Sequence, residues 1–175
     1  MQYEPGERID GQILWNGTPG APKIAPGNYT LVMRVGTDSV ELPYTIKGDP
    51  NYAVSDADIE AQTAFLLQVR DKFNEVQHGL KTIKEIRNQL NSVTGKLGDT
   101  CPKEMKDTAA YIEKALQAVE QELYQTKARA FQDVLNYPVK LNDKLSGLYD
   151  AAAAGVVAPS RQCRERGRPQ RLRAA

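Results

Sequence analysis

The sequence predicts an α+β protein with strands in its first fifty residues and helices in most of the remainder. Six of the ten prolines and seven of the thirteen glycines lie in residues 1–50, where apolar residues alternate with a period of two. From residue 51 to residue 158 the apolar residues recur at steps of three and four, which is typical of helices that bury one face. We therefore divide the chain into a β module at 1–50 and a helical region at 51–158.

Two strands are predicted at residues 29–35 and 40–46, joined by a turn at 36–39. Each strand places its apolar residues on one face: Tyr29, Leu31, Met33 and Val35 in the first, and Val40, Leu42, Tyr44 and Ile46 in the second. Pro43 cannot donate a ladder hydrogen bond, so the second strand is expected at an edge or with the missing donor facing outward. A third strand is predicted at residues 9–15, where Ile9, Ile13 and Trp15 are apolar.

Three strands cannot close a fibronectin-like or immunoglobulin-like β-sandwich, which takes about seven strands and about 100 residues. The β module is therefore predicted to be a partial sandwich. Either it packs on the helices, or its partner strands belong to another part of a longer protein.

The helical region is predicted to form an antiparallel three-helix bundle with a long first helix, because short connections make neighbouring helices antiparallel. Ser55 is the expected N-cap, and the proline-free run to Thr94 predicts a helix about 58 Å long. Glycines at 95 and 98 predict a break, and Pro102 suits the first turn of a second helix that reaches about Leu135. A third, shorter helix carries the apolar residues Leu141, Leu145, Leu148 and Ala152.

No catalytic, cofactor-binding or metal-binding residue is predicted. The single histidine excludes every site built on two histidines, and His78 has only Glu75 as a carboxylate one turn away. Cys101 lies at the start of the second helix, where the helix dipole can lower a thiol pKa, but a small structural residue is the preferred interpretation. Cys163 lies near the C-terminus, and no spacing pattern supports a bridge between the two cysteines.

Other polar and aromatic groups have equally ordinary interpretations. The carboxylate pairs Asp56/Glu60 and Asp71/Glu75 are four residues apart and are interpreted as a solvated helix face. Asn16 and Asn28 match the short glycosylation acceptor pattern, which carries little weight. Four aromatic residues could line a sugar-binding face, although a core or a domain junction is favoured: Trp15, Tyr29, Tyr44 and Tyr52.

Charge and hydropathy exclude several classes of protein. No apolar run approaches the roughly 18 residues of a membrane-spanning helix, and the N-terminal residues lack the pattern of a signal peptide. The chain carries a net charge of +1, but residues 160–175 hold six arginines and one acid. The remaining residues are mildly acidic, which argues against a nucleic-acid-binding fold.

The arginine-rich segment at 159–175 is predicted to be a disordered tail. It could contact phosphate groups of RNA or anionic lipid. Its abrupt change from lysine to arginine usage also fits a shift of reading frame after about Ala158, and both explanations remain open.

Three segments resemble one family in the family's own order. They are PGNYTLVMRVGTDSVELPYTIKGDPNY at 26–52, SDADIEAQTAFLLQVRDKFNEVQHGLKTIKEIRNQL at 55–90, and EQELYQTKARAFQDVLNYPVKLNDKLSGLY at 120–149. They are similar to the last strands of a fibronectin-like module and the following helices in bacterial sortilin-like glycosyl hydrolases. The resemblance covers about residues 20–157.

The resemblance implies a role outside catalysis. Proteins of this family are similar to exported, multidomain proteins with a large β-propeller of Asp-box repeats, and no such repeat is present here. The chain is thus expected to be a non-catalytic C-terminal accessory region of such a protein, a structural or interaction module that contacts the upstream propeller and sandwich strands. By resemblance, the parent protein is periplasmic or secreted. The alternative is a stand-alone helical module for protein–protein interaction or dimerisation.

Overall fold

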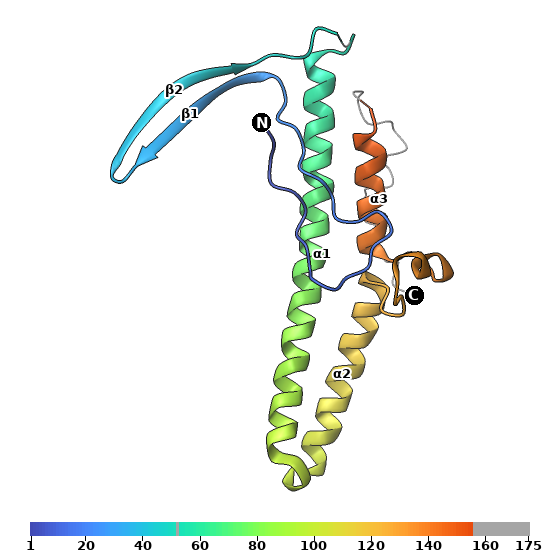
Figure 1. Ribbon diagram of the computed structural model, residues 1–175. Coiled ribbons are helices and arrows are strands. Elements are labelled where there is room, and N and C mark those ends of the chain that lie inside the picture. The colour runs from blue at the N-terminus through green and yellow to red at the C-terminus, as the bar shows by residue number, and fades with distance from the viewer. Residues whose placement is uncertain (52, 156–175) are drawn as a thin grey trace, which may run out of the picture.

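The computed structural model describes residues 1–51 and 53–155, and it has the predicted α+β composition. Figure 1 shows one long helix, α1, beside which two shorter helices lie end to end, with a β-hairpin that projects away from the helices. The elements in chain order are β1 (Gly27–Val35), β2 (Asp38–Ile46), α1 (Asp56–Leu97), η1 (Gly98–Thr100), α2 (Lys103–Leu123), η2 (Phe131–Asn136) and α3 (Leu141–Ala153).

Helix α1 begins and ends at residues that satisfy its terminal backbone groups. The Ser55 hydroxyl accepts a hydrogen bond from the Asp58 backbone N–H at 3.1 Å, which confirms the predicted N-cap. At the other end the N–H of Gly98 bonds to the Thr94 carbonyl, and Gly98 has φ +50°, a conformation that favours glycine. The helix therefore extends to Leu97, three residues beyond the predicted end.

The second helix is shorter than predicted, since α2 ends at Leu123 and not near Leu135. Tyr124 is extended at the end of α2. In the loop that follows, the Gln125 side-chain amide donates a hydrogen bond to the Pro138 carbonyl at 3.0 Å. It also accepts one from the Lys127 backbone N–H at 3.2 Å. The contact with Pro138 and the local turn at Lys127 outweigh the helical periodicity that continues through this segment.

The three helices do not close around one another along their whole length. Helix α2 runs beside the C-terminal half of α1, and α3 runs beside its N-terminal half (Figure 1). At each level of the molecule only two helices lie side by side. In the half of the molecule formed by α1 and α3, residues 1–26 lie across the helix pair (Figure 1). We call this segment the strap.

The strap takes the place of the predicted third strand. Residues 9–15 form no strand, and the expectation of one is wrong. The strap loops back on itself, and its two arms are joined by hydrogen bonds from Tyr3 N to Pro22 O and from Gly6 N to Pro19 O, both 2.8 Å. Other backbone groups of the strap bind side chains of the helices, which leaves them unable to pair as a ladder.

The hydrophobic core lies where α1, α3 and the strap meet. The predicted α1 stripe is confirmed between Leu66 and Ile83, and Phe73 at its centre is fully buried. Tyr149 and Ala152 of α3 pack against Leu66. Helix α2 contributes no buried residue, so its apolar stripe is only partly covered.

The two predicted strands are confirmed as an antiparallel hairpin with the register Leu31↔Leu42 and Met33↔Val40. Gly36 and Thr37 form a two-residue loop, and Gly36 has φ +62°, which matches a turn with glycine at its first central position. The apolar face, predicted to be half-buried, is instead exposed within the described chain. Its members are exposed by 44–70%: Leu31, Met33, Val35, Val40, Leu42 and Tyr44.

The position of the core makes a testable prediction about stability. We expect Phe73→Ala to lower the free energy of unfolding by about 3–5 kcal/mol, because it leaves a cavity at a fully buried position of α1. Val93→Ala, at a half-exposed position of the same helix, should change it by less than about 0.5 kcal/mol. Urea denaturation followed by helical circular dichroism measures both values, and equal losses would contradict this placement of the core.

Candidate functional site

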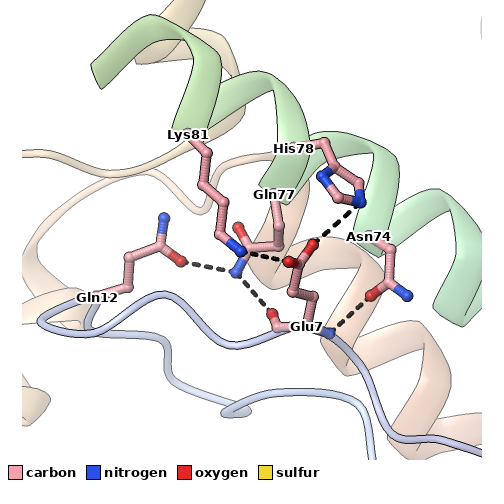
Figure 2. A network of polar contacts seen from close by, with 6 residues as sticks. All are labelled: Glu7, Gln12, Asn74, Gln77, His78 and Lys81. Atoms are coloured by element: carbon pink, nitrogen blue, oxygen red, sulfur yellow. Dashed lines mark hydrogen bonds and ion pairs between the residues drawn. The ribbon is translucent and has the colours of Figure 1, made fainter. Parts of the chain in front are cut away.

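The most concentrated polar cluster joins the strap to the middle of α1. Figure 2 shows Glu7 and Gln12 of the strap facing four α1 side chains, and we call these six residues the polar clasp: Glu7, Gln12, Asn74, Gln77, His78 and Lys81. The Glu7 backbone N–H donates to Asn74 Oδ1 at 2.7 Å. The Glu7 carboxylate accepts from Lys81 and lies 3.3 Å from His78 Nε2.

Gln77 is the buried centre of the polar clasp. Its side chain is fully buried, and its amide nitrogen donates to the Glu7 carbonyl at 3.2 Å and to Gln12 Oε1 at 2.8 Å. A buried amide without partners would cost about 1–3 kcal/mol. The position of the strap therefore decides whether Gln77 stabilises or destabilises the core.

The electrostatics of the polar clasp favour an ionised Glu7. The hydrogen bond from Lys81 lowers the pKa of the Glu7 carboxyl, and partial burial opposes this effect. The charge of His78, when it is protonated, and the charge of Lys81 lower the pKa further. Glu7 is only about one quarter exposed. The polar clasp thus holds a charged carboxylate between the strap and α1.

Further side chains bind the strap backbone in the same manner on either side of the polar clasp. Arg70 Nη1 donates to the Glu4 carbonyl at 2.9 Å, and Ser146 Oγ donates to the Gly17 carbonyl at 2.6 Å. The Asn16 backbone N–H donates to Asp143 Oδ1 at 3.1 Å. Side chains of both α1 and α3 therefore determine the path of the strap.

A separate ion-pair network links α2 to α1. Arg87 Nε donates to Glu113 at 2.8 Å, and its terminal nitrogens donate to both oxygens of Glu120 at 2.9 and 3.2 Å. The hydrogen bond to Glu120 is the largest cause of a raised Arg87 pKa. Because α2 buries no side chain, this paired geometry is the most specific contact that orients it.

His78 lies on the exposed surface of α1, beside the strap. Its side chain is 70% exposed, and its nearest acid is Glu7 of the strap instead of the expected Glu75. Glu75 itself pairs with Lys72. Among residues 1–51 and 53–155, no cluster of three potential ligands could hold a metal ion, and within the same residues no helix is long and apolar enough to cross a membrane.

The other candidate residues are dispersed over the molecule. Asp56, Glu60, Asp71 and Glu75 are exposed, as expected for a solvated face. Cys101 is buried. Cys163 and the 159–175 tail lie outside the described residues.

The aromatic residues considered for sugar binding do not form one surface. Trp15 stacks on Phe131 with ring centroids 5.0 Å apart, at the junction between α2 and α3. Tyr29 and Tyr44 are cross-strand partners in the hairpin, and Tyr52 lies outside the described residues. Asn16 is engaged with Asp143, and Asn28 is exposed beside Thr45.

One open cavity lies at the base of the hairpin, with a volume of about 480 Å³. Its lining includes Asn28, Thr45, Lys47, Asp49 and Asp56. Asp49 already accepts hydrogen bonds from the Asn51 backbone and side chain, both at 2.9 Å. The cavity is open, its lining is mixed polar and apolar, and none of the lining residues is a nucleophile positioned by a base.

Sequence reasoning missed the strap and the polar clasp. A signal was present, since Gln62, Thr63 and Gln77 lie on the apolar stripe of α1 and Asn142 and Ser146 on that of α3. Polar residues at core positions need partners. The strap backbone accepts hydrogen bonds from Thr63, Gln77 and Ser146. Gln62 instead donates to the Ala152 carbonyl of α3.

The Glu7 carboxylate makes the stability of the fold depend on pH. A lowered folded-state pKa means that Glu7 stabilises the fold above its unfolded pKa of about 4.3, and that this contribution is lost as pH falls through the folded value. We expect Glu7→Gln to lower the melting temperature at pH 7, with a difference from wild type that shrinks as the pH is lowered toward about 3.

The matched control is Glu85→Gln, which changes an exposed carboxylate of α1. It should leave the melting temperature nearly unchanged at both pH values. Thermal denaturation of all three proteins measures the effect. A Glu7→Gln difference that persists unchanged at pH 3 would contradict the role assigned to the charged carboxylate.

Comparison with known proteins does not assign the chain to a family. No family model, no characterised protein and no solved structure gives a significant match. The function must therefore be argued from the geometry of the two features described above, the strapped helical core and the hairpin with its exposed apolar face.

Proposed function

We propose that the chain is a non-catalytic structural and interaction module that presents a β-hairpin on a rigid helical arm. The main support for this proposal is the exposed apolar face of the hairpin. Six apolar side chains on one face are each about half exposed, although a two-stranded hairpin alone is only marginally stable in water. Such a face is typical of a surface that another protein or domain covers.

The helical arm supplies the rigidity that this role needs. The polar clasp and the core fasten α1, α3 and the strap together, and the strap leads directly into β1 at Gly27. The chain then returns from β2 to the start of α1 within ten residues. Both ends of the hairpin are thereby anchored to the same helical core.

The occupant that fits best is a β-sandwich domain, because the face of a hairpin with alternating apolar side chains matches the inner face of a sheet. The resemblance noted in the sequence gives this proposal a context. The chain would be the C-terminal accessory region of an exported sortilin-like glycosyl hydrolase protein, and the hairpin would complete the fibronectin-like module that follows the propeller.

A second candidate function is self-association through the helices, as a stand-alone interaction or dimerisation module. It is favoured by α2, on which Met105, Tyr111 and Val119 are exposed by 43%, 75% and 53%. A short hollow of about 250 Å³ also lies between α1 and α2 near Leu90 and Ala109. Concentration-dependent dimerisation that Tyr111→Lys abolishes would favour this candidate.

The first experiment reads the DNA on both sides of the coding sequence. The proposal expects Asp-box repeats and further strands upstream, in frame or one base out of frame. An independent promoter and ribosome-binding site, with nothing related before them, would contradict the sortilin-like context and leave the stand-alone module as the explanation.

The second experiment expresses the upstream strand module together with this chain. We expect the two to copurify, and we expect Leu42→Lys to reduce copurification at least tenfold because it places a charge on the apolar face. Glu41→Lys is the matched control, since the neighbouring residue lies on the opposite face of the same strand. Equal behaviour of the two variants would contradict docking through the apolar face.

A further inference from the structure

Among the described residues no third strand pairs with either edge of the hairpin. The register of the hairpin determines which backbone groups face outward. The two-residue loop makes Val35↔Asp38 a hydrogen-bonded pair, and such pairs alternate with non-hydrogen-bonded pairs along an antiparallel ladder. Thr30↔Pro43 is therefore a non-hydrogen-bonded pair, as the missing N–H of proline requires. The backbone groups of these two residues point away from the partner strand.

The outer edge of β2 is poorly suited to pair with another strand. Its outward groups belong to Ser39, Glu41, Pro43 and Thr45. Pro43 interrupts the row of donors near its middle, and Glu41 adds a charge beside the interruption. Proline and charged residues are the features that commonly prevent an edge strand from pairing.

The outer edge of β1 carries a complete row of donors and acceptors. Its outward groups belong to Asn28, Thr30, Val32 and Arg34, none of which is proline. The only charge in this row is Arg34, next to the turn. An added strand could therefore form an unbroken ladder, with a neutral or acidic residue opposite Arg34.

The area of the apolar face also favours an added strand. Six half-exposed side chains present on the order of 500 Å² of apolar surface, which is less than the roughly 800 Å² that each partner buries in a standard interface. A partner strand paired along β1 would increase the total buried area. The sheet to which that strand belongs could then cover the apolar face of the hairpin. A partner that only covered the face would leave the β1 backbone groups unpaired.

We propose that the outer edge of β1 accepts an extended strand from a β-sandwich partner, while β2 remains the edge of the completed sheet. This inference rests on the proposed docking role of the hairpin and specifies its geometry. The accepted strand has apolar side chains at alternate positions, on the same face as Tyr29, Leu31 and Met33. Affinity comes from the backbone ladder, and specificity from those alternate side chains.

The test uses the whole chain and a capped peptide with the β1 sequence, GNYTLVMRV, as a strand probe. Antiparallel pairing centred on Leu31 places Arg34 opposite the peptide's asparagine, so no like charges face each other. Two matched variants remove one outward donor each, Val32→Pro from β1 and Glu41→Pro from β2. These residues are direct partners in the register, so neither variant removes a β1–β2 hydrogen bond.

We expect the peptide to slow hydrogen exchange at the outward amides of Thr30, Val32 and Arg34 in the wild-type chain. Val32→Pro should weaken peptide binding about tenfold, the effect of one lost hydrogen bond and a broken ladder. Glu41→Pro should leave binding within about twofold. Amide chemical shifts of Leu31 and Met33, whose N–H groups face β2, report whether the hairpin is intact in each variant.

The possible failures are distinguishable. Protection of Glu41 or Thr45 in place of the β1 amides, or a greater loss in Glu41→Pro, would overturn the assignment of the edge. Peptide binding that Leu42→Lys abolishes and neither proline variant affects would overturn strand addition but retain docking through the face. No protection of any hairpin amide at millimolar peptide would also overturn strand addition, and copurification with the upstream module would then test the docking role independently.

Discussion

The fold depends on hydrogen bonds between buried polar side chains of the helices and the backbone of the strap. Gln77 is fully buried yet donates only to strap atoms, and Ser146 of α3 is likewise buried and donates to Gly17. A helix pair with these residues on its contact faces could not bury them alone without an energetic cost. The strap lowers that cost, because its oxygens accept hydrogen bonds from the Gln77 amide nitrogen and the Ser146 hydroxyl.

This dependence divides the molecule into regions of unequal stability. The half of α1 that packs on α3 and the strap contains all nine buried residues of that helix, the last being Ile83. Beyond Ile83, α1 is contacted mainly by α2, which is oriented by Arg87 and buries no side chain. The hairpin has even less support, since its strands contact only each other along most of their length (Figure 1). Local opening is expected to follow the same order.

Local patterns in the sequence predicted the elements that depend on local chemistry. The Ser55 cap, the glycine at the end of α1, the two strands and their turn were all readable, because each depends on neighbouring residues. The early end of α2 was not, because Gln125 forms its contacts with Pro138 in three dimensions. The strap was not predicted either, since residues 9–15 have the apolar spacing of a strand and its partners lie on helices more than 60 residues away. The absence of a catalytic constellation stays a prediction, tested by assays on the chain.

We propose that a self-sufficient helical core carries a hairpin that needs a partner. The most direct measurement is amide hydrogen exchange along the isolated, monomeric chain. We expect amides in α1 between residues 62 and 83 to exchange slowest, and the inward amides of the hairpin to exchange at least about a hundredfold faster. A monomer whose hairpin amides are as slow as those of the α1 core would contradict the claim, because its hairpin would already be stable without a partner.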